Sequence, residues 1–295
     1  MKKYLLATIP LSLCLFFAAC EQHIGISVIP IPQHVELHRG FFAFNGNTRL
    51  WVEAPEGDKE LLQKYLCASP LSLIVAETKP ISNALVLNVV ETLPDVDSAE
   101  GYVLTVDKSG VLIEAIAPVG LFYGVQTLVQ MYADNKVPMG RIVDAPRFAY
   151  RGMMIDVSRH FFDVDFIKKE IDAMARYKLN RLHLHLTDAA GWRIEIARYP
   201  RLTEFAAWRT HATWKEWWNG DRMHVEEGTE GAYGGYLTKA EARELVAYAA
   251  LMAASRNERT LGEVAYIAAE KAVRANPNSR YIADGVVALM CHIAQ

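Results

Sequence analysis

The segment of residues 150–196 constrains the fold of this chain more than any other part. Its first apolar run, residues 153–157, is interrupted only by Asp156, which is typical of a strand covered on both faces. From Phe166, apolar residues recur at helical spacing, with charged residues on the opposite face. Leucine then alternates with histidine over residues 182–186, which is the period of a β-strand. The segment therefore predicts a βαβ unit.

Polar side chains collect where these two predicted strands end. Asp156, Arg159 and His160 end or follow the first strand, and Asp188 follows the second. The carboxyl ends of parallel strands lie at one edge of a sheet, and binding sites in α/β folds are built at that edge. The sequence therefore predicts a site there.

Two long motifs within this segment are shared with one protein family. R-G-x-M-x-D-x-S-R-H-F begins at Arg151, and H-L-H-L-T-D-x-x-G-W-R begins at His183. Together they resemble the opening of the catalytic barrel of glycoside hydrolase family 20, the β-N-acetylhexosaminidases. Upstream, residues 100–106 and 120–130 resemble the small α/β domain that precedes the barrel in that family. The resemblance implies an α/β protein with a small α/β N-terminal domain followed by a TIM-type (β/α)8 barrel.

We divide the chain into four regions on this basis. Residues 1–20 are an export or lipoprotein signal, and residues 25–145 are the small α/β domain. Residues 146–250 are the first part of the barrel, and residues 251–295 are a helical tail that does not resemble the family. In the small domain we expect a helix at 119–133, a connection to the barrel at 141–148, and strands at 41–44, 50–52, 85–90, 102–106 and 111–115.

The predicted barrel is incomplete. An eight-fold barrel takes about 250 residues, which is more than residues 151–295 supply. An open barrel leaves strand edges exposed, so we expect the chain to be unstable alone or to pair with something. Residues 208–235 are expected to form a long loop over the strand ends, whose tryptophans either stack on sugar faces or pack on one another. Thr238 and Glu241 have the spacing of a capping box, which predicts a helix from Lys239.

The resemblance implies an exo-acting β-N-acetylhexosaminidase with a substrate-assisted, retaining mechanism. In the family, the 2-acetamido oxygen of the substrate is the nucleophile. A glutamate protonates the leaving oxygen, and the aspartate before it orients the acetamido group. No Asp-Glu dipeptide occurs in this sequence. No catalytic residue is therefore identifiable, and we expect the chain to be truncated before that pair.

Two residues match the sugar-holding side of the family's pocket. The resemblance assigns Arg151 to the hydroxyls at C3 and C4 of the terminal sugar, a contact that suits a forked donor. It assigns Asp188 to support of the acid through an intervening histidine. The alternatives are a buried ion pair for Arg151 and a cap on the following turn for Asp188. We expect Asp156, Arg159 and His160 to hold their loop by ion pairing.

A metal site at the paired histidines is the less favoured alternative. His183 and His185 lie one residue apart on the second strand, and such pairs bind metal in other hydrolases. Further ligands are not identifiable on later strands, so packed histidines are expected. Neither a metal nor a cofactor is predicted.

The first twenty residues indicate export. Lys2 and Lys3 precede an apolar run at residues 5–17, which is too short to span a membrane. L-F-F-A-A-C, ending at Cys20, is close to a bacterial lipoprotein cleavage site, with Cys20 as the lipidated residue. We expect an exported protein of the periplasm or outer membrane, held to the membrane by a lipid anchor. Ordinary secretion and an uncleaved anchor are the alternatives.

Composition excludes some classes of function. The net charge of −3 with both signs scattered leaves no footprint for nucleic acid. The predicted function is exo-β-N-acetylhexosaminidase acting on N-acetylhexosamine-terminated glycans. The alternatives are a catalytically inactive surface lipoprotein that binds glycans and a nonfunctional gene fragment.

Overall fold

A seven-stranded mixed sheet forms the N-terminal half of the computed structural model, which describes residues 25–252. The strand order is β1-β7-β5-β6-β4-β2-β3. Pairing is antiparallel from β1 to β6 along this order and parallel from β6 to β3. The strands are β1 (His34–Ala43), β2 (Arg49–Glu53), β3 (Ile74–Val75), β4 (Ala84–Val89), β5 (Tyr102–Val106), β6 (Gly110–Ala115) and β7 (Lys136–Asp144). The prediction of an α/β protein is confirmed.

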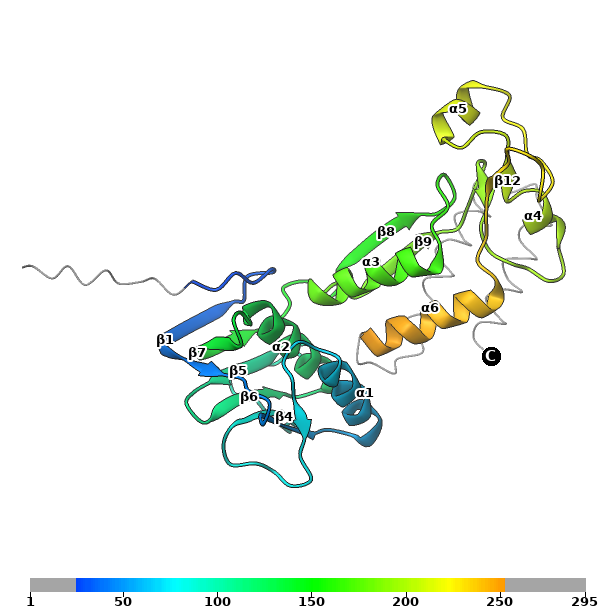
Figure 1. Cartoon of the computed structure of the whole chain (residues 1–295). Helices are drawn as coiled ribbons and strands as arrows, with labels where there is room; N and C mark the ends of the chain where they lie inside the picture. Colours follow the sequence, from blue (N-terminus) through cyan, green and yellow to red (C-terminus); the bar gives the residue numbers. More distant parts are fainter. Residues whose placement is uncertain (1–24, 253–295) are drawn as a thin grey trace, which may run out of the picture.

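Two helices, α1 (Glu56–Cys67) and α2 (Pro118–Met131), pack against this sheet (Figure 1). Pro118 lies in the first turn of α2, where its missing N–H is not needed. Most of α2 is buried, because it lies between the sheet and the second half of the chain (Figure 1). The rings of Tyr65 on α1 and Phe122 on α2 meet edge to face at 5.2 Å. The two helices and the sheet therefore share one core.

Three elements of this half, α1, β3 and β7, were not predicted from the sequence. Helix α1 follows Pro55 and buries Leu62 and Leu66. Strand β7 includes Pro138 and Gly140, which normally interrupt strands. Gly140 has φ +155°, and a Cβ there would lie 2.2 Å from the Glu36 carbonyl oxygen. The predicted connection at 141–148 is therefore wrong up to Asp144, where β7 ends.

The predicted βαβ unit is confirmed. It consists of β8 (Gly152–Asp156), α3 (Val164–Arg176) and β9 (Arg181–His185). The two strands pair in parallel, with Met153 opposite Leu182. The Asp163 carboxylate caps α3 by accepting a hydrogen bond of 2.9 Å from the Phe166 backbone N–H.

The rest of the described chain consists of short elements and one long helix. The predicted loop at 208–235 contains a short helix, α5 (Trp214–Asn219), between the two strands of a small antiparallel sheet. The predicted capping box at Thr238 and Glu241 is present and begins α6 (Lys239–Met252), which packs on α3. Within residues 25–252, no helix is both long and apolar enough to cross a membrane. The short elements are β10 (Thr187–Asp188), β11 (Gly191–Trp192), α4 (Arg201–Glu204), β12 (Trp208–Arg209) and β13 (Tyr233–Gly234).

The two halves of the chain meet through a buried polar contact as well as through apolar packing. The Lys178 ammonium donates to the Asp144 carboxylate and to the Tyr102 hydroxyl, each at 2.8 Å. Burial lowers the pKa of Lys178, although the Asp144 carboxylate opposes that shift. Lys178 has φ +58°, which places it in the left-handed region, two residues after the end of α3. The export signal predicted at 1–20 lies outside the described residues, as does nearly all of the tail predicted at 251–295.

Candidate functional site

Four polar side chains meet at the carboxyl ends of β8 and β9. Asp156 is the last residue of β8 and His185 is the last residue of β9, while Arg159 and Asp188 follow these strands. The Arg159 guanidinium bridges the two aspartates, with Nη1 2.6 Å from Asp156 Oδ2 and Nη2 2.6 Å from Asp188 Oδ2. His185 Nε2 lies 3.1 Å from the same oxygen of Asp188. We call these four residues the strand-end cluster.

Backbone hydrogen bonds hold both aspartates in place. Asp156 Oδ1 accepts from the backbone N–H groups of Ser158 and Arg159, at 3.0 and 2.9 Å. This short turn brings the Arg159 side chain back over the end of β8. Asp188 Oδ1 accepts from the Ala189 N–H at 2.7 Å and so caps the turn after β9. The carboxylates are therefore positioned before any ligand arrives.

The strand-end cluster has the chemistry of a site that binds hydroxyl groups. It places two carboxylates around one guanidinium and a histidine beside one of the carboxylates, and the Arg159 side chain remains 40% exposed. A guanidinium is a rigid forked donor, and a carboxylate accepts several hydrogen bonds. Two adjacent hydroxyls on a small ring can accept hydrogen bonds from the guanidinium and donate to a carboxylate at the same time. Among residues 25–252, no group of three or more His, Cys, Asp or Glu side chains is placed to hold a metal ion.

A buried arginine supports the loops behind this cluster. Arg193 is fully buried and donates to the backbone carbonyls of Val157, Ser158, Ala207 and Gly235. Burial lowers the pKa of Arg193 to about 10, and the charge of Arg209 acts in the same direction. No carboxylate within the described residues forms an ion pair with this guanidinium. Backbone carbonyls surround it instead, the Phe161 ring lies 5.8 Å away, and the charge of Asp156 attracts it at longer range. Arg193 thereby ties the turn that carries Arg159 to two other loops.

Arg193 was not singled out from the sequence. It is the last residue of the second shared motif, which ends in G-W-R, so the motif already included it. Whether an arginine is buried among backbone carbonyls depends on which loops surround it in the fold, and the sequence does not show which loops those are.

The resemblance implied that Arg151 lies at the sugar-binding site. The structure instead places it outside the strand-end cluster. Arg151 precedes β8 and therefore lies at the amino end of that strand, the opposite end from Asp156. Its guanidinium forms a two-pronged ion pair with Glu100, with N–O distances of 2.9 and 3.1 Å. It also donates to the Tyr123 hydroxyl and to the carbonyls of Phe148 and Lys178. The geometry is that of the alternative interpretation, a buried ion pair.

The other predicted residues divide between the cluster and the surrounding loops. Asp188 lies in the cluster and also caps the following turn, so both interpretations of it describe its contacts. Ion pairing of Asp156 with Arg159 is confirmed, but Arg159 also reaches Asp188. His160 is exposed, and its Nδ1 lies 2.9 Å from the Tyr233 hydroxyl. His160 therefore contacts β13 and not the cluster.

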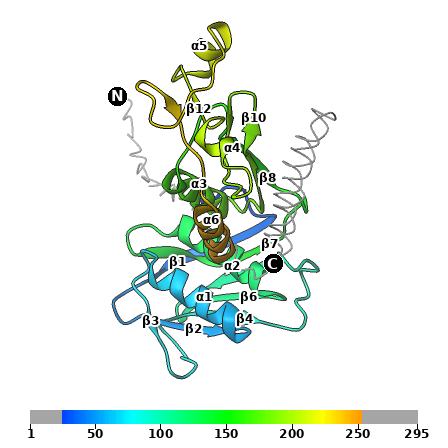
Figure 2. The same ribbon diagram turned by 90° about the vertical axis from the view of Figure 1, so that its right-hand side faces the viewer.

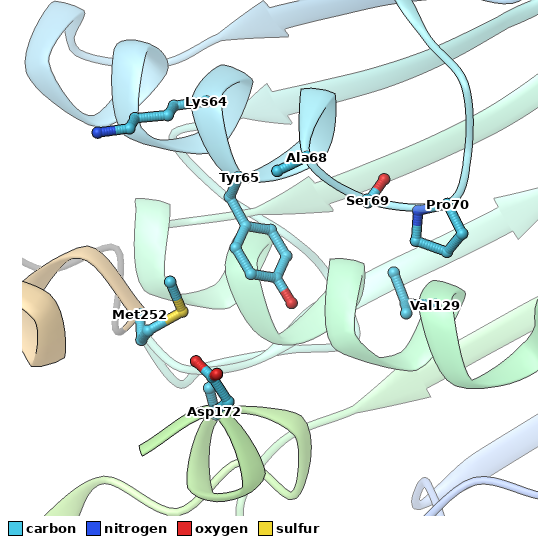
Figure 3. Close-up of a pocket in the computed structure, with 9 residues that line it drawn as sticks. Lys64, Tyr65, Ala68, Ser69, Pro70, Val129, Asp172 and Met252 are labelled. Atoms are coloured by element: carbon cyan, nitrogen blue, oxygen red, sulfur yellow. The ribbon is translucent and has the colours of Figure 1, made fainter. Parts of the chain in front are cut away.

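A cavity of about 350 Å³ lies elsewhere, between the helices that join the two halves (Figure 3). Tyr65, Asp172 and Met252 face it from α1, α3 and α6. The Asp172 carboxylate accepts a hydrogen bond of 2.7 Å from the Tyr248 hydroxyl. Its lining residues lie on helices or in the loop just after α1, and none belongs to the strand-end cluster, so the cavity is separate from the strand ends. We therefore place the candidate site at the strand-end cluster.

Comparison with known proteins identifies the family. The family model for "Glycosyl hydrolase family 20, catalytic domain" matches residues 148–255, and that for domain 2 of the same family matches residues 25–145. The chain belongs to glycosyl hydrolase family 20. A curated relative, the "Beta-hexosaminidase" of Porphyromonas gingivalis, is 39% identical over 240 residues, which cover 76% of this chain. The "N,N'-diacetylchitobiase" of Vibrio harveyi is 31% identical over 264 residues, which cover 88% of it.

Solved structures of the family have the same fold over most of this chain. The exo β-N-acetylglucosaminidase of Vibrio harveyi, solved with N-acetylglucosamine, is 29% identical with a TM-score of 0.63 and covers 77% of this chain. A mutant Streptomyces plicatus β-hexosaminidase, solved with its product GlcNAc, is 36% identical with a TM-score of 0.61. The match covers 34% of the first structure and 44% of the second. This family 20 chain spans 29% of the length of each of the two curated relatives named above.

Proposed function

We propose that this chain supplies the sugar-binding part of an exo-acting β-N-acetylhexosaminidase that uses a substrate-assisted, retaining mechanism. Residues 25–145 are the small α/β domain of that enzyme, and residues 146–250 are the first part of its TIM-type barrel. The names of the relatives support this proposal, since they are hexosaminidases and a chitobiase. The βαβ unit with its polar strand ends supports the assignment to a barrel.

The observation that carries the proposal is the bridge from Arg159 to Asp156 and Asp188. We assign to Arg159 the contact with the hydroxyls of the terminal N-acetylhexosamine, the role first predicted for Arg151. The guanidinium is partly exposed at the carboxyl edge of the strands, where a ring hydroxyl can reach it. Asp188 accepts from Arg159 and lies beside His185, so it orients the donor and can accept from a hydroxyl itself. Arg193 holds the turn that presents Arg159.

The chemical step requires groups beyond this cluster. The acid must reach the glycosidic oxygen in its protonated form, and the adjacent aspartate must orient the acetamido group. No Asp-Glu dipeptide occurs in the 295 residues. That observation favours a second candidate function for the chain by itself, which is glycan binding without hydrolysis.

We propose in addition that the protein is exported and lipidated at Cys20, which lies outside the described residues. The motif that ends at Cys20 supports this proposal. Growth with labelled palmitate tests it, because the label should enter the wild-type protein and not the Cys20→Ser variant. Equal labelling of both proteins would contradict it.

Calorimetric titration with N-acetylglucosamine tests the binding proposal. Arg159→Ala removes a charged donor, and we expect it to weaken binding about tenfold or more. Arg159→Lys keeps the charge but loses the fork, so it should not restore the affinity. Arg201→Ala is the matched control, because Arg201 forms an exposed pair with Glu226 away from the cluster. Equal affinity of the Arg159→Ala and wild-type proteins would refute the assignment.

Turnover is measured separately with a chromogenic N-acetylglucosaminide. We expect binding without release of the chromophore from this chain. Hydrolysis that persists after repurification would show that another acid replaces the absent pair.

A further inference from the structure

Two tryptophans in the segment 208–235 are exposed although their neighbours are packed inside. The segment holds four of the six tryptophans of the chain. Trp208 and Trp217 donate their indole N–H groups to the carbonyls of Thr203 and Met223, at 2.9 and 3.0 Å. Trp214 and Trp218 on α5 are 41% and 40% exposed. Within residues 25–252, neither of these two indole N–H groups has an acceptor.

Helix α5 holds these two side chains in fixed positions. Thr213 and Glu216 form a complete capping box at its start. Trp217, which is 3% exposed, anchors the underside of the helix. The Thr210 hydroxyl donates to Asp221 at 2.7 Å and joins the two ends of the turn. The exposure of Trp214 and Trp218 is therefore a property of a well-connected element and not of a loose loop.

The exposed surface combines aromatic faces with hydrogen-bond donors. The Trp214 and Trp218 rings stack with centroids 5.4 Å apart and planes 20° apart. The Arg222 guanidinium lies 4.2 Å from the Trp218 ring, and its Nε donates to the Trp218 carbonyl at 2.7 Å. A sugar ring has an apolar C–H face and a rim of hydroxyls. Indole faces accept the first, and the N–H groups of indole and arginine match the second.

This surface is connected to the strand-end cluster. His224 Nε2 lies 3.0 Å from the carbonyl of Ala189, the residue after Asp188, and its Nδ1 lies 3.0 Å from the Trp208 carbonyl. The segment that carries α5 is thus attached to the turn that carries a cluster residue. Figure 1 shows α5 beyond the carboxyl ends of β8 and β9, and Figure 2 also shows it at the end of the chain fold that lies away from the N-terminal sheet. A glycan whose terminal sugar lies at Arg159 can extend in that direction.

We propose that Trp214 and Trp218 form a second carbohydrate subsite, which binds a sugar on the leaving-group side of the terminal N-acetylhexosamine. This inference rests on the proposed function, because the terminal sugar at Arg159 sets the direction of the chain. The occupant is a β-linked oligosaccharide, since a ring with an apolar face and hydroxyl edges fits the paired indoles and Arg222. The subsite makes the protein prefer glycans longer than one sugar.

Titration with β-1,4-linked N-acetylglucosamine oligomers of one, two and four units tests the proposal. Wild-type protein should bind the four-unit oligomer about five- to tenfold more tightly than the single sugar, the worth of one good aromatic contact. Trp214→Ala and Trp218→Ala should each remove most of that gain and leave the affinity for the single sugar unchanged. Trp214→Phe keeps a ring and should retain part of the gain. Phe148→Ala is the matched control, an exposed aromatic residue at the other end of β8.

The outcomes separate this proposal from the proposed function. A gain with length that survives both tryptophan variants, or no gain in the wild type, overturns the subsite and leaves the Arg159 assignment standing. Binding of the four-unit oligomer that needs Trp214 but not Arg159 supports the subsite and overturns the Arg159 assignment. No binding at any length overturns both. A dimer that Trp214→Ala dissociates in sedimentation, without any effect of length, makes the surface a contact between copies and overturns the subsite.

Discussion

Replacement of Arg151 by methionine tests whether the ion pair at the amino end of β8 joins the two halves of the chain. The Arg151 guanidinium makes two bonds to Glu100, one to the Tyr123 hydroxyl, and one each to the carbonyls of Phe148 and Lys178. The Arg151 side chain is 13% exposed and that of Glu100 is 24% exposed. The substitution leaves a partly buried carboxylate without its counterion and two carbonyls without a donor.

The expected loss of unfolding free energy follows from this burial. Removal of one partner from a fully buried ion pair costs about 3–5 kcal/mol. Glu100 would keep its hydrogen bond of 3.1 Å from Asn180, and some water reaches it. We therefore expect Arg151→Met to lower the free energy of unfolding by about 2–4 kcal/mol. Glu100→Gln should lower it by less, because the amide still accepts from Arg151.

Urea unfolding followed by two probes measures this effect. Five of the six tryptophans lie in the second half of the chain, so fluorescence reports that half, whereas far-ultraviolet circular dichroism reports both. In Arg151→Met the two midpoints should move apart, with fluorescence changing at the lower urea concentration. Arg201→Met is the control, because its ion pair with Glu226 is 61% and 57% exposed and should contribute less than about 1 kcal/mol.

A double-mutant cycle decides between coupling and independent effects. Glu100→Gln combined with Arg151→Met should be less destabilising than the sum of the single changes by about 1–2 kcal/mol. Strict additivity, or a loss in Arg151→Met no larger than in Arg201→Met, would refute the argument.

Three further predictions concern acid stability, the buried guanidinium and the packing of α2. Burial acts to raise the pKa of Glu100, but the hydrogen bonds from Arg151 and Asn180 outweigh it, and the pKa lies below its ordinary value. The stabilisation by the Glu100 carboxylate is therefore complete above about pH 4.3, the unfolded pKa, and is lost as pH falls through the lower folded pKa. The melting temperatures of the wild-type and Glu100→Gln proteins should converge in acid. A constant difference between them across this pH range would contradict the prediction. Arg193→Lys should lower the free energy of unfolding, measured in urea, by about 2–4 kcal/mol, because an ammonium cannot donate to four carbonyls from three loops. A near-neutral change would show that the carbonyls find other donors. Gly124→Ala should lower the free energy of unfolding by about 1–3 kcal/mol, and with it the melting temperature, even though alanine favours helices. The reason is that the new Cβ would lie 2.5 Å from Ile113 Cγ2. A raised melting temperature would show that α2 can shift.

Local sequence patterns were sufficient to predict the βαβ unit, from its periodicity, and the helix after Thr238, from its capping box. The apolar spacing of α3 and the alternation in β9 are properties of a few consecutive residues. Burial follows the spacing in α3, whereas all five residues of β9 are half-buried. Strand β7 was missed for the opposite reason. Pro138 and Gly140 interrupt its local pattern, and only pairing with β1 and β5 makes it a strand.

The arginine of the candidate site shows where motif matching alone fails. Arg151 and Arg159 lie in the same motif, and its letters do not say which one reaches the site. Their positions relative to β8 decide it, because Arg151 precedes the strand and Arg159 follows it. The rule that sites lie at the carboxyl ends of strands placed Arg159 at the predicted site, whereas the motif match assigned the sugar contact to Arg151. The ion pair of Arg151 with Glu100 was not predictable, since it spans fifty-one positions and two separate halves.

Stability and ligand binding depend on residues at opposite ends of β8. The amino end carries the contacts that join the halves, and the carboxyl end carries the candidate site. The strand has five residues, so the two ends are about 16 Å apart. Substitutions at such a distance usually add independently. A library that varies the residues around Glu100 and Asn180 can therefore be selected for thermal stability alone, and ligand recognition need be checked only on the few survivors.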